Sequence, residues 1–281
     1  MNERASNLVQ RVATAVVALP IIFALLYAAP PWAFYLLVLG AALVAVHELL
    51  GMTHPGDGTS QAIGIAISAA ASIAVYVGPD DPRVLLTVLA AVPIAGPLVT
   101  LARLGAIETA ALRACALGFA PLFVAVPPTL LALMRRTLGS AGPGCVVLAL
   151  GLGWFTDTGA YFAGRLFGHR KLYEAVSPKK TVEGALGGLV AGVVWALFSA
   201  LVLLPPGMLP PAHAVALGVA GGVLGQAGDL AESMLKRSTG HKDSGAIVPG
   251  HGGVLDRIDA VLVTATVVYL YARWVWAAQI G

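Results

Sequence analysis

The feature that most constrains the fold of this chain is a succession of apolar runs, each close to the roughly 20 residues that a helix needs to cross a bilayer. Of the 281 residues, 58% are hydrophobic and only 11% are charged, whereas a soluble domain carries about 25% charged residues. The mean hydropathy is +0.85. These values predict an all-α, polytopic integral membrane helix bundle, because helices satisfy their own backbone hydrogen bonds in lipid.

We expect nine membrane-spanning helices, separated by turns rich in Pro and Gly. They are predicted at residues 12–29, 32–50, 61–78, 84–102, 114–134, 144–166, 183–204, 213–235 and 257–279. The polar residues divide unevenly between them. We therefore expect residues 1–140 to supply scaffold helices and residues 141–281 to supply catalytic helices and loops, within one membrane-embedded unit.

Loop charges predict the orientation. If the N-terminus is cytoplasmic, thirteen of the seventeen Lys and Arg residues fall on the cytoplasmic side, as the positive-inside rule requires. Arg83, Arg135, Arg136 and Arg273 fall on the other side. We expect the charge-rich loops to face the cytoplasm.

The first five predicted spans carry few polar residues. His47 and Glu48 are the exception, and because a zinc-protease helix needs a second His, we interpret them as an interfacial or helix-packing pair. Cys115 and Cys145 lie in separate apolar runs without a CxxC motif. Both are predicted to be buried small hydrophobic side chains.

The last four predicted spans differ, because they contain carboxylates in or at the edge of apolar helices: Asp157, Asp229, Glu232, Asp256 and Asp259. A charge at mid-membrane costs about 2.5–3.5 kcal/mol on insertion scales, so these side chains should face a polar cavity. Asp229, Glu232 and Lys236 have helical spacing and share one face. Asp256 and Asp259 share a face at the start of the last span.

These two acidic faces flank a loop that contains Lys, Gly and His. Mg²⁺ takes one or two protein carboxylates together with phosphate oxygens and water, so Asp229, Asp256 and Asp259 are candidate metal ligands. For Asp256 and Asp259 the alternative is capping, because acidic residues at a helix start interact favourably with the helix dipole.

Basic residues accompany the carboxylates. Residues 233–259 hold seven charged side chains in twenty-seven positions, and Lys and Arg suit phosphate oxygens. Upstream, residues 177–181 (Ser-Pro-Lys-Lys-Thr) predict a Pro-fixed turn before a helix, presenting Lys179 and Lys180 to phosphate while Glu183 engages backbone donors. The alternative for such lysines is anchoring at the lipid surface. Asp157, Tyr161 and Arg165 form a polar stripe, for which an interhelical hydrogen-bond set is the alternative.

Absent motifs narrow the chemistry. The sequence contains no GxxxxGK[ST], GxGxxG, GxSxG or HExxH pattern, which disfavours the common soluble NTPase, dehydrogenase and hydrolase designs. Basic residues do not alternate with aromatic ones, so no nucleic-acid partner is expected. The residues indicate phosphoryl or nucleotidyl transfer at a membrane surface.

At these positions the sequence resembles the bacterial phosphatidate cytidylyltransferase family, also called CDP-diacylglycerol synthase. The family pattern is met by Ser233, Lys236, Arg237, Lys242, Asp243, Pro249, His251, Gly252, Gly253, Asp256, Arg257 and Asp259, with upstream blocks at 157–165 and 177–184. The blocks cover about the last 45% of the chain, and the first half resembles the family only in hydropathy and Arg11. Val182 stands where the family often has an aromatic residue.

The resemblance implies an all-helical enzyme of the bacterial inner membrane that acts in phospholipid biosynthesis, with its active site facing the cytoplasm. Its substrates would be CTP and phosphatidic acid, its cofactor Mg²⁺ with a second, monovalent cation such as K⁺, and its assembly a homodimer. Its products would be CDP-diacylglycerol and pyrophosphate. Two alternatives remain open, a CTP-dependent lipid-alcohol kinase and a membrane transporter with intramembrane acidic residues.

On this hypothesis, Asp229, Lys236, Asp256 and Asp259 are catalytic, and the three Asp residues bind the metal. The residues expected to bind substrate are Asp157, Arg165, Ser177, Lys179, Lys180, Thr181, Ser233, Arg237, Lys242, Asp243, His251, Gly252, Gly253 and Arg257.

Overall fold

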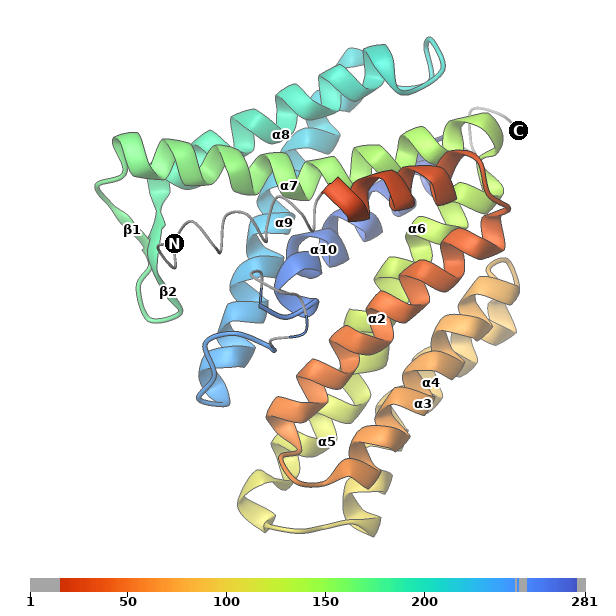
Figure 1. Ribbon diagram of the computed structural model, residues 1–281, viewed down its shortest axis with the longest axis vertical. Coiled ribbons are helices and arrows are strands. Elements are labelled where there is room, and N and C mark those ends of the chain that lie inside the picture. Colours follow the sequence, from red (N-terminus) through yellow and green to blue (C-terminus); the bar gives the residue numbers. More distant parts are fainter. Residues whose placement is uncertain (1–15, 246, 248–251, 277–281) are drawn as a thin grey trace. The chain divides into compact units, whose positions relative to one another are not determined.

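The computed structural model describes residues 16–245, 247 and 252–276 (Figure 1). Within them, eight helical segments are long and apolar enough to cross a membrane: Pro31–Thr53, Gly58–Val77, Pro82–Ala102, Ile107–Thr137, Gly139–Phe167, Val182–Val202, Pro211–Ser238 and Leu255–Trp276. They correspond to eight of the nine predicted spans. The remaining span, predicted at 12–29, is described from residue 16, where a shorter apolar helix covers Val16–Tyr27. The chain is a polytopic helical membrane protein, as predicted.

The regular helices within these segments are α2 (Pro31–Thr53), α3 (Gly58–Val77), α4 (Pro82–Ala102), α5 (Ala110–Phe119), α6 (Val126–Thr137), α7 (Gly142–Phe167), α8 (Val182–Val202), α9 (Pro211–Ser238) and α10 (Leu255–Tyr271). A π-helical turn at Ala120–Ala125 joins α5 to α6. Pro121 lies in this turn, and since Pro lacks the backbone N–H that a regular helix would use there, the local widening has an identifiable cause.

The chain divides into two compact units. Unit 1 comprises Met1–Leu133 and His241–Arg257, and unit 2 comprises Met134–Gly240 and Ile258–Gly281. The boundaries fall within α6 and near the start of α10. Unit 1 therefore includes a loop from late in the sequence, a grouping that the apolar pattern alone does not predict.

Unit 1 has a core in which aromatic packing and hydroxyl contacts join α2, α3 and α6. The rings of Tyr35 and Tyr76 stack with centroids 3.7 Å apart. The Tyr35 hydroxyl lies 3.2 Å from Ser72 Oγ, which lies 2.6 Å from Thr129 Oγ1. Such interhelical hydrogen bonds stabilise helix packing where lipid offers no polar partners.

Unit 2 relies on small residues for close helix packing. Gly184, Gly188 and Gly192 are buried at four-residue intervals on α8, which lies along α7 (Figure 1). A Cβ on Gly188 would lie 2.7 Å from the Thr156 carbonyl oxygen of α7, so this contact requires Gly. On α10, the Thr264 hydroxyl donates to the Ala149 carbonyl of α7 at 2.8 Å.

A small antiparallel hairpin interrupts the helices of unit 2. It consists of β1 (Lys171–Tyr173) and β2 (Ser177–Thr181), with Lys171 opposite Thr181 and Tyr173 opposite Ser177. The predicted Pro-fixed turn at 177–181 is therefore wrong, because Pro178 lies in a strand. A two-stranded hairpin has only edge strands, which tolerate a residue without an N–H donor.

The two cysteines have different surroundings. Cys145 is buried, as predicted, whereas Cys115 is exposed. The prediction was wrong for Cys115, because an apolar span has an outward side on which a small residue needs no protein neighbour.

Candidate active site

In unit 2, the hairpin and α9 bring together a lysine and a carboxylate from separate parts of the sequence. Lys180 Nζ lies 2.5 Å from Asp229 Oδ2 in an ion pair whose side chains are 28% and 19% exposed. Successive side chains of a strand point to opposite faces. Lys179 is accordingly exposed, so the two lysines that the sequence treats as equivalent have different surroundings.

A second ion pair follows two turns later on α9. Lys236 Nζ lies 2.6 Å from Glu232 Oε2, at i,i+4 spacing, and Glu232 is only 1% exposed. A buried pair of this kind costs desolvation energy that its mutual attraction only partly offsets. Its presence in an apolar helix is better explained by chemistry than by stability, as the sequence analysis expected for this face of the helix.

Further carboxylates surround these pairs. Asp259 of α10 interacts electrostatically with Asp229, Asp157 and Glu232. Unit 2 thus gathers four carboxylates around two ammonium groups, Lys180 and Lys236, which leaves a formal excess of two negative charges. This donor set fits a divalent cation with oxygen ligands.

Among the described residues, no group of three or more His, Cys, Asp or Glu side chains lies close enough to hold a metal ion. The carboxylates of unit 2 lie within electrostatic range of one another without forming a complete cage. Mg²⁺ seldom uses such a cage, because it keeps several waters and binds substrate phosphates.

Other predicted site residues of unit 2 lie at its polar edge. Ser233 Oγ is 3.5 Å from Asp229 Oδ1. Arg237 is exposed, and its Nε lies 3.5 Å from the Val176 carbonyl oxygen. Arg165 is also exposed and donates to the Tyr161 hydroxyl at 3.1 Å, which forms part of the predicted polar stripe.

The start of α8 fixes the end of the hairpin at which β2 joins the helix. Thr181 is its N-cap and accepts a hydrogen bond from the Gly184 N–H at 3.1 Å. Glu183 accepts bonds from the N–H groups of His169 and Arg170, at 3.0 and 3.2 Å, so the prediction that Glu183 engages backbone donors is confirmed. These contacts hold the strand that carries Ser177, Lys179 and Lys180.

In unit 1, Asp256 lies in the first turn of α10. Its Oδ2 accepts hydrogen bonds from the N–H groups of Ser244 and Gly253, each at 3.0 Å. Both donors belong to the loop before α10, so Oδ2 holds this loop, whereas the alternative given from the sequence was interaction with the dipole at the helix start. A carboxylate has about four lone-pair sites, so these contacts of Oδ2 are compatible with a further ligand.

The remaining described residues predicted in unit 1 lie on the loop before α10, except Arg257, which lies in the first turn of α10. Lys242, Asp243 and Arg257 are exposed. Gly252 has φ +82°, a conformation that favours glycine. His251 and Pro249 lie outside the described residues.

Glu48 has a structural role that the sequence did not predict. This residue of α2 is only 5% exposed, and it accepts hydrogen bonds from the Ser244 hydroxyl at 3.0 Å, the Val254 N–H at 3.0 Å and the Leu255 N–H at 2.8 Å. It therefore caps α10 from a helix about 200 residues earlier in the chain. His47 is exposed, so of the two residues Glu48 alone takes part in helix packing.

Two glycines allow the loop to approach Glu48. A Cβ on Gly253 would collide with Ser244 Oγ and lie 2.5 Å from Glu48 Oε2. A Cβ on Gly245 would lie 2.6 Å from Glu48 Oε1. Gly253, which the sequence places among the residues expected to bind substrate, thus lies within unit 1 against a carboxylate of the protein itself.

Comparison with known proteins gives a match over most of the chain. Residues 9–275 match the model of the family described as the Cytidylyltransferase family. Phosphatidate cytidylyltransferase of Bacillus subtilis is 46% identical over 125 residues, which are 44% of this chain and 44% of the relative. The protein of that name from Brucella suis is 46% identical over 127 residues (45% and 46%), and that from Haemophilus influenzae 48% identical over 112 residues (38% and 38%). Each of these matches spans less than half the length of the relative.

Proposed function

Because the chain belongs to the cytidylyltransferase family, we propose that it transfers the cytidylyl group of CTP to phosphatidic acid, giving CDP-diacylglycerol and pyrophosphate. The family match confirms the resemblance that the motifs predict. The substrates are supported by the names of the relatives, which are phosphatidate cytidylyltransferases.

The observation that carries the proposal is the ion pair between Lys180 and Asp229. It links the Ser-Pro-Lys-Lys-Thr block to α9, on which the longer family pattern begins four residues later at Ser233. A lysine held by a carboxylate can turn to a phosphate oxygen when a polyanion arrives, and the carboxylate is then available to a cation. This exchange suits a site that binds a triphosphate.

In the proposed reaction, a phosphate oxygen of phosphatidic acid attacks the α-phosphorus of CTP. A new P–O bond forms, the bond between the α-phosphorus and the bridging oxygen breaks, and pyrophosphate leaves with the electron pair. Because the nucleophile is already anionic, no strong general base is required. Catalysis then depends on positioning and charge neutralisation.

The residues have distinct proposed tasks. Asp229 and Asp259 of unit 2 hold Mg²⁺, and Asp256, one turn before Asp259 on α10, stands as a predicted further ligand. Bound Mg²⁺ would neutralise phosphate charge. Lys180 and Lys236 bind phosphate oxygens from the pairs they now form, and the exposed Lys179, Arg165 and Arg237 extend this basic surface.

We also propose that the site faces the cytoplasm, where CTP is made. The distribution of Lys and Arg among the loops supports this orientation. The homodimer and the second, monovalent cation are further proposals that follow from the family resemblance.

The test is product analysis with purified protein in phosphatidic acid-containing vesicles, CTP and Mg²⁺. We expect equal amounts of pyrophosphate and CDP-diacylglycerol. Release of CDP with a phosphorylated lipid would indicate the kinase alternative, and solute uptake without CTP turnover would indicate a transporter. Either result would overturn the proposal.

A further inference from the structure

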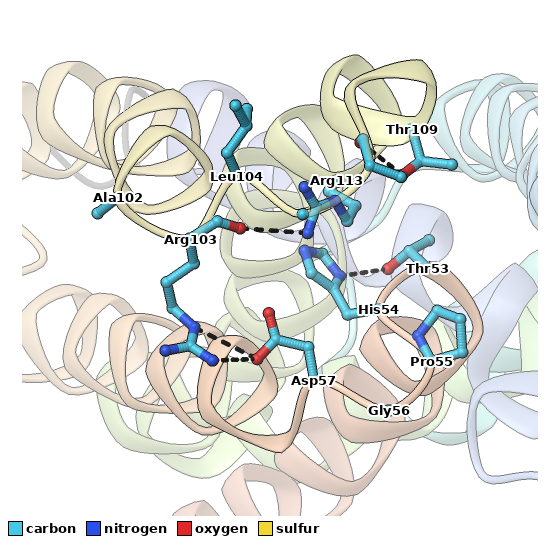
Figure 2. Close-up of a pocket in the computed structure, with 12 residues that line it drawn as sticks. Thr53, His54, Pro55, Gly56, Asp57, Ala102, Arg103, Leu104, Thr109 and Arg113 are labelled. Atoms are coloured by element: carbon cyan, nitrogen blue, oxygen red, sulfur yellow. Dashed lines mark hydrogen bonds and ion pairs between the residues drawn. The ribbon is translucent and has the colours of Figure 1, made fainter.

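A pocket of about 680 Å³ lies in unit 1, and none of its lining residues is among those assigned above to catalysis or substrate binding (Figure 2). It is lined by the connection between α2 and α3 and by the connection between α4 and α5. Four successive membrane-spanning segments therefore end or begin at this pocket. Because successive spans alternate in direction, all four of these ends lie at the same boundary of the membrane.

The pocket contains a buried guanidinium with unused hydrogen-bond donors. Arg113 of α5 is only 8% exposed, and its Nη1 donates to the Arg103 carbonyl oxygen at 3.3 Å. Within the described part of the chain, its Nε and Nη2 have no hydrogen-bond partner. Leaving donors of a buried charged group unsatisfied carries the desolvation cost of that group without compensation, so a ligand that accepts from them is favoured.

The backbone beside Arg113 is shaped to its side chain. Gly105 has φ +55°, and a Cβ there would lie 2.9 Å from Arg113 Nη1 and 3.2 Å from Nη2. A glycine therefore allows the loop after α4 to pass directly over the guanidinium. The position of the cation is defined by two separate contacts, the Arg103 carbonyl and this loop.

His54 supplies a second unused polar atom. It is 2% exposed, and its Nδ1 lies 2.9 Å from Thr53 Oγ1. Among the residues described, its Nε2 lacks a hydrogen-bond partner. Figure 2 shows the His54 ring between Arg113 and Asp57. Burial and the nearby Arg113 guanidinium lower the pKa of His54, so the ring is neutral at pH 7. Nε2 donates to a ligand when the Thr53 hydroxyl turns from the Leu49 carbonyl to donate to Nδ1 instead.

The one carboxylate in the pocket is already neutralised. Asp57 Oδ1 pairs with Arg103 Nη2 at 2.8 Å, and its Oδ2 accepts a bond from Ser60 Oγ at 2.5 Å. The Arg103 and Ser60 hydrogen bonds hold the pKa of Asp57 well below its usual range. With Arg103 and Arg113 positive and Asp57 negative, the lining has a formal charge of +1 at neutral pH.

We propose that this pocket binds a phosphate group, carried either by an anionic phospholipid headgroup or by a free phosphate. Arginine donates to phosphate through more than one N–H at once, which matches Nε and Nη2 of Arg113. Leu104 lines the pocket and is 42% exposed, and Leu101 and Ile107, each next in sequence to a lining residue, are 70% and 66% exposed, which provides a surface for acyl chains next to the headgroup.

The experiment measures thermal unfolding of the full-length protein in two arms. One arm adds inorganic phosphate, with sulfate-free chloride at equal ionic strength as reference. The other compares nanodiscs of pure phosphatidylcholine with nanodiscs containing phosphatidylglycerol, which is not the proposed substrate. We expect the ligand to raise Tm by about 2–4 °C. A shift in the lipid arm alone would indicate that the pocket binds a phospholipid headgroup, and a shift in both arms would indicate that it also binds free phosphate.

Arg113→Gln should abolish this shift, because it removes the buried cation, and it should weaken the apparent Kd at least about tenfold. The matched control is Arg83→Gln, at the other end of α4, where the side chain is exposed; it removes the same charge and should keep the shift. If Arg113→Gln fails to fold, Arg103→Gln provides the second variant, since its side chain is 41% exposed and its loss makes the lining neutral.

Two results would overturn the proposal. One is the absence of a shift in both arms for the wild-type protein. The other is an equal shift in the wild type and in the pocket variant, which would show that phosphate acts elsewhere. Neither result bears on the cytidylyl-transfer proposal, because no residue of this pocket belongs to that site.

Discussion

The carboxylates at the start of α10 in unit 1 and those along α9 in unit 2 are satisfied in different ways. In unit 1, Glu48 and Asp256 accept hydrogen bonds from backbone N–H groups and from one serine hydroxyl. In unit 2, Asp229 and Glu232 are paired with the ammonium groups of Lys180 and Lys236. Glu48 therefore meets fixed neutral donors, whereas Asp229 and Glu232 meet charged side chains, as Asp57 of unit 1 does with Arg103.

This difference distinguishes carboxylates that hold a loop in position from carboxylates that can exchange their partners. Backbone donors cannot leave a carboxylate without unfolding the loop that carries them, so Glu48 and the Oδ2 atom of Asp256 fix the conformation of the loop before α10. An ammonium group on a four-carbon stem can move to a phosphate oxygen while its former partner takes a cation. We therefore expect substitution of Asp229 in unit 2 to affect turnover and substitution of Glu48 in unit 1 to affect stability.

The largest expected effect comes from Asp229→Asn, which removes a charge at the proposed metal site while keeping the size of the side chain. We expect pyrophosphate release to fall by about 10²–10³-fold, as when one charge-stabilising group of an active site is lost. The measurement is the initial rate at saturating CTP and phosphatidic acid. The matched control is Glu174→Gln, on the exposed hairpin, and a rate within twofold of wild type for Asp229→Asn would break the comparison.

The next effect is that of Glu48→Gln. The side-chain amide of Gln keeps one acceptor oxygen, but its NH₂ group places donors against the backbone N–H donors. We therefore expect a loss of about 2–4 kcal/mol in the free energy of unfolding. Hydrogen exchange at the amides of Val254 and Leu255 should accelerate, because both donate to Glu48. Unchanged protection at these two amides would show that the cap is not needed.

A smaller effect is expected for Gly253→Ala, whose Cβ would meet Ser244 Oγ and Glu48 Oε2. Overpacking of this kind costs about 1–3 kcal/mol. The control is Gly51→Ala on α2, where a Cβ would have nothing within 4 Å and where alanine favours the helix. Thermal unfolding of both variants gives the comparison, and equal melting temperatures would contradict it.

The smallest effect belongs to Asp57→Asn, which breaks the partly exposed ion pair with Arg103 while keeping an N-cap for α3. We expect a change of about 0–1 kcal/mol. Because the pKa of Asp57 is lowered in the folded state, the pair stabilises the fold above the unfolded pKa of about 4, and this contribution is lost as the pH falls through the folded pKa. The wild type and the variant should therefore converge in stability at low pH.

Much of the fold follows from the apolar pattern, because span length and loop composition are local properties. Eight predicted spans coincide with described helices. The sequence did not predict the hairpin because its strands are short and polar, and because Pro178 is typical of a turn. The pairing that makes Pro178 part of a strand depends on Lys171 and Thr181, which the sequence does not mark as partners.

The candidate site was predictable in part. Helical spacing placed Asp229, Glu232 and Lys236 on one face, and the ion pair within that face is observed. The partnership of Lys180 with Asp229 was not predictable, because it joins residues 49 positions apart through a strand that the sequence did not indicate. Glu48 offered one signal: a carboxylate in an apolar run, with no Lys or Arg three or four residues away, needs distant donors.

The most direct test of the contrast between the units is a Mg²⁺ binding isotherm of the purified protein, recorded without substrate. Asp229→Asn should weaken the apparent affinity at least about tenfold, as the loss of a group at a metal site does, whereas Glu48→Gln should leave it within twofold of wild type. Wild-type Mg²⁺ affinity in Asp229→Asn, together with a large loss in Glu48→Gln, would contradict the account.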